Sequence, residues 1–466
     1  MMLASSSQRL ISRRLLPTAA ATASTLDYYP SSGLRYYHAT QKKEILPLIA
    51  GLGILFIGRY SWKASQRMND EWSDYQWMLQ QYERRHGVVS DKNSSNNNKY
   101  PDGTLAIDIG TFYLKLAKDK SVLVNREGAR VTFGGTVVDG EETLIGQRAF
   151  EKFYEMQQSN PDNVSLGDPK SIPTVVQTAV TDALERANAD LSKIRPIITV
   201  PPLKWDGYEA AFQSIFPGAT LVPEPVAAIW GAQAEKDLPD HVDTPILVID
   251  IGGLETTLSV VQKNVIVSTT TIETIGGDLY VQAVVDHVGS MREAVRQDGM
   301  ALQRVYQAAH TAVAELNSQT HAQLHIPYIG MNLETKEPEH LDERVARTVV
   351  EQKVLETILS TIDPSKLSTH MPPPTSLSFL WMSILTQLLE VTDMTPMQLS
   401  HVLVVGGGAK HAMMEASVKE CFVTLQGNSD NVVCPDARLE AIALGAASML
   451  PNYQYDTESG LVRDEE

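Results

Sequence analysis

Two short segments of the sequence share one pattern, and this repeat limits the fold more than any other feature. Each is an apolar β-type run that reaches Asp-Ile-Gly and continues into a second apolar run: LAIDIGTFYLKLAKD at 105–119 and LVIDIGGLETTLSVV at 247–261. A carboxylate is costly to bury in a strand without a partner, whereas an acid followed by glycine suits a tight turn that opens onto a pocket. We therefore expect two β-hairpins whose turns hold Asp108 and Asp250 outside the core.

The glycines of these turns indicate the chemistry of the pocket. Glycine lets a backbone approach a ligand closely, and its N–H group can bind a phosphate oxygen. Aspartates at the turns suit the water shell of Mg²⁺, which prefers one or two carboxylates together with phosphates. A third segment, VVGGGAK at 404–410, lies between a predicted strand and a predicted helix, where it would receive the rest of a nucleotide. Singly, each motif is most often just a turn, but three in this order predict a polyphosphate site.

Strand-like and helix-like segments alternate from residue 104 onward, which predicts an α/β domain with mixed sheets. The expected strands are 105–117, 129–138, 194–202, 219–223, the second hairpin at 247–261, and 400–405. The expected helices are 170–191, 206–216, 224–237, 411–422 and 438–450, with further helical stretches in 276–320 and 340–400.

The acidic composition limits the partners. The chain has 466 residues and a net charge of −17, so it lacks the positive charge that would neutralise nucleic-acid phosphates, and no nucleic-acid partner is expected. Its two cysteines, Cys421 and Cys434, exclude a disulfide scaffold and a cysteine-rich metal site.

The first hundred residues differ in composition from the rest. Residues 1–40 are rich in Ser, Ala and Arg with no acid before Asp27, which is typical of a mitochondrial or plastid transit peptide; the alternative is a disordered basic tail. Residues 44–63 predict a single transmembrane helix, because an uncharged run continues into Tyr60 and Trp62, which suit the membrane interface. A core helix is the alternative, and Pro47 disfavours it. A charged helix at 64–86, a polar linker at 87–103 and the globular domain at 104–466 complete the predicted organisation.

The motifs of this domain resemble those of the actin-like ATPases and, within that superfamily, the nucleotide-binding domain of Hsp70 chaperones. The likeness runs from about Leu105 to Leu450. Its segments are IDIGT at 107–111, IITVPP at 197–202, PEPVAAIWG at 223–231, IDIGG at 249–253, IGGDLY at 275–280, VLVVGGGAK at 402–410 and LEAIALGAA at 439–447. The resemblance implies the actin-like fold, with two lobes that each contain a mixed β-sheet flanked by helices, a nucleotide cleft between the lobes, and ATP or ADP with Mg²⁺ as cofactors.

The resemblance also implies roles for individual residues. Asp108 and Asp250 would hold Mg²⁺ through its bound water molecules and would position the attacking water. Glu224 would orient the attacking water. The remaining members of the implied catalytic set are Thr111 and Lys170. Lys170 follows NPDNVSLGDP with similar but not identical spacing, and an ordinary surface lysine is the alternative. The nucleotide contacts implied are Gly110, Thr111, Phe112, Tyr113, Gly252, Gly253, Gly276, Gly277, Gly406, Gly407, Gly408 and Lys410.

Several positions depart from the family pattern, which marks the domain as divergent. Phe112 replaces a threonine in the first turn, and Leu254 and Glu255 replace a glycine and a threonine in the second. Where the family clamps adenine with a Glu, a Lys-Arg pair and a Ser on one helix, this chain has His310, Val313, Ala314 and Asn317. The short stretch after Lys170 predicts that an outer subdomain of the first lobe is missing or reduced, and no substrate-binding domain is expected after the nucleotide domain.

Three functions fit these observations. The first is a membrane-anchored, Hsp70-like, ATP-binding switch with slow ATP hydrolysis in the mitochondrial chaperone system, with a J-protein, a nucleotide exchange factor or another chaperone as partner. The second is a degenerate actin-like scaffold that does not hydrolyse ATP. The third is a sugar or acetate kinase, which the Glu-Pro signature at 224–225 disfavours. The expected location is the mitochondrial inner membrane, with a plastid or other organelle membrane as the alternative.

Overall fold

The computed structural model divides the chain into two compact units, Met1–Ser94 and Ser95–Glu466. The described residues all lie in the second unit: 102–110, 112–119, 121–125, 128–140, 142–166, 172–187, 189–204, 212, 215–240, 242–291, 298–331, 335–449, 453–456 and 460–463. The predicted transit peptide, membrane helix and charged helix, and all but the end of the linker, lie outside these residues. Within the described part of the chain, no helix is both long and apolar enough to cross a membrane.

The first lobe contains a mixed six-stranded sheet with the order β3-β2-β1-β8-β9, in which β4 also pairs with β2. Its strands are β1 (Thr104–Ile109), β2 (Tyr113–Lys118), β3 (Ser121–Val122), β4 (Thr132–Phe133), β8 (Arg195–Val200) and β9 (Thr220–Pro223). β1 and β2 form the first predicted hairpin, while β8 runs parallel to β1. This parallel neighbour places the end of β8 beside Asp108.

The second lobe repeats this arrangement in a five-stranded sheet with the order β12-β11-β10-β15-β16. Its strands are β10 (Ile246–Ile251), β11 (Thr256–Gln262), β12 (Val265–Ile272), β15 (His401–Val405) and β16 (Val432–Val433). β10 and β11 form the second predicted hairpin, and β15 runs parallel to β10. Each lobe thus has an antiparallel hairpin with a parallel strand next to its first arm.

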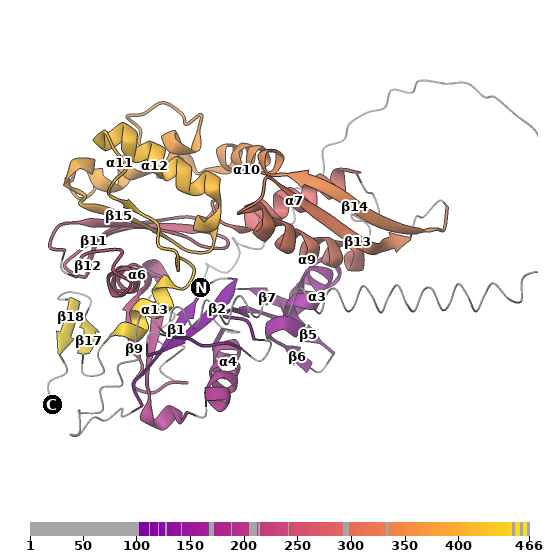
Figure 1. The fold of residues 1–466 in the computed structure, drawn as a ribbon, viewed down its shortest axis with the longest axis horizontal. Helices are drawn as coiled ribbons and strands as arrows, with labels where there is room; N and C mark the ends of the chain where they lie inside the picture. The colour runs from indigo at the N-terminus through magenta and orange to yellow at the C-terminus, as the bar shows by residue number, and fades with distance from the viewer. Residues whose placement is uncertain are drawn as a thin grey trace, which may run out of the picture. The chain divides into compact units, whose positions relative to one another are not determined.

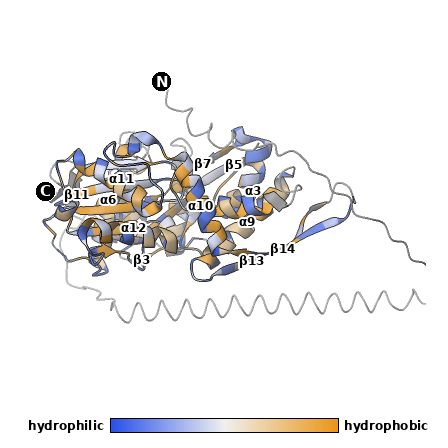
Figure 2. Ribbon diagram, turned by 90° about the horizontal axis from the view of Figure 1, so that it is seen from above, coloured by the Kyte–Doolittle hydropathy of each residue, from blue (hydrophilic) through white to orange (hydrophobic). Residues whose placement is uncertain are grey.

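Two helices lie between the sheets (Figure 1). They are α6 (Glu224–Ala234) and α13 (Ala441–Ser448), which pack on each other. One buried cluster joins these helices to residues of both sheets, such as Ala106 and Val248. Figure 2 shows apolar residues concentrated in the strands beside α6. The alternation of strands and helices and the two mixed sheets confirm the predicted α/β class, and the architecture is consistent with the actin-like fold.

Seven further helices are among the described residues. They are α3 (Gly146–Ser159), α4 (Ile172–Ala187), α7 (Asp278–Met291), α9 (Gly299–Leu316), α10 (Arg347–Thr361), α11 (Leu377–Glu390) and α12 (Ala412–Gln426). The remaining strands are β5 (Gly135–Asp139), β6 (Glu142–Leu144), β7 (Val164–Leu166), β13 (His321–Met331), β14 (Pro338–Ala346), β17 (Tyr453–Asp456) and β18 (Gly460–Arg463).

The β13–β14 hairpin corrects the prediction of a helical stretch from residue 340. β14 continues to Ala346, and α10 begins only at Arg347. The signal was present in β13, whose exposed and buried residues alternate from His321 to Ile326, as the strand period of two requires.

The outer ends of the two lobes are joined through α3 and α9, which lie side by side (Figures 1 and 2). Tyr154 of α3 stacks on Tyr306 of α9 at 3.6 Å between ring centroids, and its hydroxyl lies 3.0 Å from Nε2 of His310. The buried amide of Gln303 accepts a hydrogen bond from the Tyr154 N–H at 2.8 Å and donates one to the Phe150 carbonyl at 2.8 Å. Side chains of the protein itself therefore connect the lobes at this end.

Candidate functional site

Asp108 is buried in the first sheet, contrary to the prediction that it lies at a turn outside the core. It is the second-last residue of β1, and 1% of it is exposed. Its Oδ1 accepts a hydrogen bond from the hydroxyl of Thr199 at 3.2 Å, and its Oδ2 lies 2.5 Å from Nζ of Lys115. The expectation was wrong because a cross-strand cation supplies the partner that a buried carboxylate requires.

Lys115 lies at the centre of the candidate site, and the sequence motifs did not indicate it. It is the antiparallel partner of Asp108 on β2, and 8% of its side chain is exposed. Burial by itself would lower the pKa of Lys115, but the attraction of Asp108, with further contributions from Asp250 and Glu224, outweighs it and raises the pKa above the ordinary value. The lysine therefore stays charged and links the carboxylates of both lobes electrostatically. A lysine inside the apolar run LKLA is a sequence signal of this kind, because buried lysines are rare unless paired.

Asp250 occupies the equivalent position in the second sheet. It is the second-last residue of β10, not a turn residue, and is half-buried. Gly406 fits against its carboxylate because a methyl group there would lie 2.3 Å from Oδ1 of Asp250, and its φ of +92° also favours glycine. Burial raises the pKa of Asp250 to about 6; Lys115 opposes this shift, while Asp108 and Glu255 add to it.

The predicted glycine segments of the second lobe converge on this centre. The N–H of Gly277 donates to the carbonyl of Gly252 at 2.9 Å, and the N–H of Asp278 donates to the carbonyl of Gly253 at 2.8 Å. A methyl group at Gly277 would lie 3.3 Å from the Cα of Gly408. The structure thus brings these segments together at one place, where glycines allow their backbones to touch, and their contact with a nucleotide stays a prediction.

Asp278 is the first residue of α7 and directly follows Gly277 in the chain. Its Oδ1 is buried and has no hydrogen-bond partner among the described residues. Burial raises the pKa of Asp278 to about 7, from an ordinary value of 3.8. The same negative charge contributes to the raised pKa of Tyr113, after burial of the phenol itself.

The raised pKa of Asp278 predicts a pH-dependent stability. Between about pH 4 and pH 7 the folded state holds more protons than the unfolded state, so the free energy of unfolding should fall as pH rises, by up to about 1.4 kcal/mol per unit. In urea titrations across this range, Asp278→Asn should reduce this slope and stabilise the protein above pH 7. Equal slopes for wild type and Asp278→Asn would contradict the assignment.

The first turn fills the space in front of the second. Phe112 is buried, and a methyl group at Gly253 would lie 3.0 Å from its ring, so the ring packs against the second turn. Phe112 also packs within 6.0 Å of His310, measured between ring centroids. The departure from threonine at this position therefore adds an apolar contact between the lobes.

The remaining predicted residues lie at varying distances from the centre. Glu224 is the first residue of α6, is buried, and acts electrostatically on Lys115. Lys410 ends the turn that follows Gly408 and is exposed. Thr111 and Lys170 lie outside the described residues.

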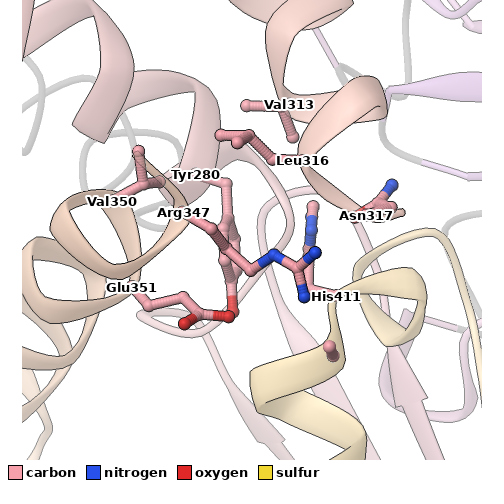
Figure 3. Close-up of a pocket in the computed structure, with 9 residues that line it drawn as sticks. Tyr280, Val313, Leu316, Asn317, Arg347, Val350, Glu351 and His411 are labelled. Carbon is pink, nitrogen blue, oxygen red and sulfur yellow. The ribbon is translucent and has the colours of Figure 1, made fainter. Parts of the chain in front are cut away.

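A small pocket adjoins the glycine turns on the side that the resemblance assigns to adenine. Figure 3 shows its side chains converging from α7, α9, α10 and the start of α12. His411 stacks on Tyr280 at 3.6 Å between ring centroids, and burial lowers the pKa of His411 to about 3. The water-accessible space is about 10 Å³, which is room for about one water molecule. Val313 and Asn317 line this space, whereas His310 packs in the contact with α3.

The side chains and backbone groups at this centre suit a phosphate group better than they suit Mg²⁺. The glycine segments offer backbone within reach of a ligand, and Lys115 offers a positive charge. Asp108 and Asp250 are suitable Mg²⁺ ligands by type, but the ammonium of Lys115 is 2.5 Å from Asp108 Oδ2. A divalent cation at the same carboxylate would face a like charge. The Mg²⁺ role of the two aspartates stays a prediction.

The two sheets each bring an aspartate and a glycine turn to one centre, which is the arrangement that the resemblance to actin-like ATPases implies. The family model described as "Hsp70 protein" matches residues 221–369. Chaperone protein DnaK of Halobacterium salinarum is 26% identical over 381 residues, which cover 74% of this chain and 54% of that protein. Heat shock protein hsp-6 of Caenorhabditis elegans is 30% identical over 236 residues, covering 49% and 31% respectively.

DnaK of Thermosipho africanus is 25% identical over 389 residues, covering 76% of this chain and 59% of the relative. The chain thus spans little more than half the length of these DnaK relatives. These matches are consistent with a divergent Hsp70-type nucleotide-binding domain.

Proposed function

We propose that this chain is an Hsp70-like ATP-binding protein that works as a nucleotide-dependent switch with slow hydrolysis in a chaperone system. The observation that carries the proposal is the convergence of the glycine segments on the centre formed by Asp108, Lys115 and Asp250. Binding of a nucleotide there would contact both lobes and so favour one lobe arrangement over another. A J-protein, a nucleotide exchange factor or another chaperone would read that change, as in the Hsp70 family generally.

Calorimetric titration of the full chain with ATP and ADP, in mild detergent, tests the proposal. We expect saturable binding of both nucleotides, together with a low rate of phosphate release from ATP. Asp250→Asn should slow phosphate release from ATP, because the resemblance assigns this residue to positioning the attacking water. Absence of any binding heat, in a chain that unfolds cooperatively, would contradict the proposal.

Glu255 explains why affinity for the nucleotide should be modest. Its charge already acts on Asp250, so it lies within electrostatic reach of the centre. A carboxylate about 6 Å from a phosphate costs about 3 kcal/mol at an effective dielectric constant near ~20, or about a hundredfold in affinity. The double change Leu254→Gly and Glu255→Thr should tighten ATP binding by up to that factor. Glu337→Thr, at an exposed acid before β14, is the matched control, and an equal or weaker affinity of the double variant would count against this explanation.

A non-hydrolysing scaffold is the second candidate, and two packed contacts favour it. Phe112 packs on Gly253, and the Tyr280–His411 stack lines the small pocket on the side that the resemblance assigns to adenine. A scaffold of this kind would keep its lobes together without nucleotide. ATP binding without phosphate release, even with a J-protein added, would favour this second function over the first.

We further propose that residues 1–40 direct the chain to mitochondria and residues 44–63 anchor it in the inner membrane. The support is the composition of these segments. A tagged full chain should co-purify with mitochondria and resist carbonate extraction. Release by carbonate would exclude the anchor, and a cytosolic signal would exclude the address.

A further inference from the structure

The candidate site contains a cation of the protein itself, the side-chain ammonium of Lys115. Nζ of Lys115 lies 2.5 Å from Oδ2 of Asp108, and the two side chains are 8% and 1% exposed. The same ammonium is close to the first glycine turn, because a methyl group at Gly110 would lie 3.7 Å from it. A phosphate held by that turn would therefore meet the ammonium directly.

Carboxylates on three elements act electrostatically on this ammonium. Asp108 lies on β1, Asp250 on β10 and Glu224 at the start of α6, and each of them favours the charged form of Lys115. Mg²⁺ would need the same carboxylates, since it is bound in proteins by one or two of them together with phosphates and water. A buried ammonium and a divalent cation at one carboxylate repel each other, because few water molecules screen them. Removal of the lysine from this pair would leave Asp108 buried without its cation.

We infer that Lys115 takes the place of the divalent metal, so that this centre binds nucleotide phosphates without Mg²⁺. The nucleotide part of this inference rests on the proposed function, whereas the exclusion of metal does not. The alternative is that Lys115 swings away and admits Mg²⁺, and the experiments below separate the two.

The wild-type full chain gives the first test. ATP affinity is measured by calorimetry with excess Mg²⁺ and with excess EDTA, and Mn²⁺ alone is titrated by electron paramagnetic resonance as a probe for the metal. We expect ATP affinities within about threefold of each other and no Mn²⁺ bound by the protein. An ATP affinity at least about tenfold higher with Mg²⁺, or saturable Mn²⁺ binding, would overturn the inference.

A pair of lysine variants gives the second test. Lys115→Met frees Asp108 and should create a site for Mn²⁺ and an ATP affinity that rises at least about tenfold with Mg²⁺. Lys118→Met, on the same strand at a more exposed lysine paired with Asp119, should behave as wild type. If Lys115→Met does not fold, Lys115→Met combined with Asp108→Asn removes both buried charges and should bind ATP more weakly than wild type with or without Mg²⁺. An unchanged ATP affinity in the folded variant would overturn the role of Lys115.

The two proposals fail in different ways. If the wild-type chain binds no ATP in either buffer, the proposed function fails, and the Mn²⁺ titration still decides whether the centre excludes metal. If ATP binds only with Mg²⁺, the proposed function stands and the role of Lys115 fails.

Discussion

Asp108→Asn should lower the free energy of unfolding by about 3–5 kcal/mol, because it leaves the charged Lys115 buried without its partner. Lys115→Met should cost a similar amount for the opposite reason. The double variant should recover much of the loss, since replacing both members of a buried ion pair by neutral groups is often close to neutral. Urea denaturation of the four proteins gives the coupling energy of the pair directly.

The neighbouring pair Lys118–Asp119 is the matched control. Its N–O distance is 2.7 Å, but its side chains are 22% and 49% exposed. Water screens such a pair, so breaking it should cost only about 0.2–1 kcal/mol. The prediction fails if breaking either pair lowers the free energy of unfolding equally, or if the effects of the single changes at Asp108 and Lys115 add. Either result would show that burial does not strengthen the coupling between Asp108 and Lys115.

The two hairpins could be predicted from sequence, but the environment of their aspartates could not. Apolar runs on both sides of Asp-Ile-Gly fix the strands, whatever their neighbours are. The burial of Asp108 depends on the register that opposes it to Lys115 and on the parallel strand that brings Thr199 to its other oxygen. Register follows from turn geometry and from contacts distant in sequence, which the local pattern does not contain.

The base side of the site illustrates the same limit. The sequence showed that His310, Val313 and Asn317 depart from the family pattern, and so predicted a weakened adenine clamp. It did not show what replaces the clamp. Tyr280 and His411 are far apart in the chain, and their stack depends on how α7 and α12 meet. The packing around this small pocket is therefore a tertiary property.

The second large effect on stability is expected at the contact between the two helices that lie between the sheets. A methyl group at Gly445 of α13 would lie 1.7 Å from the carbonyl oxygen of Ala227 in α6, and one at Gly231 would lie 2.1 Å from that of Ala441. The two backbones are in contact at these glycines. Because α6 and α13 share a buried cluster with both sheets, the two helices cannot separate without disturbing the packing of the two sheets.

Gly445→Ala should therefore destabilise the protein by about 3 kcal/mol or more, the upper part of the range for an overpacked core. Helix propensity alone predicts the opposite sign, since alanine is favoured over glycine in a helix by about 1 kcal/mol. Gly289→Ala in α7 isolates that term, because a methyl group there meets nothing within 4 Å, and it should be neutral or stabilising. Urea unfolding of the two variants compares them directly. A Gly445→Ala protein as stable as Gly289→Ala would mean that the helices separate freely, and that their contact does not hold Glu224 in place beside the centre.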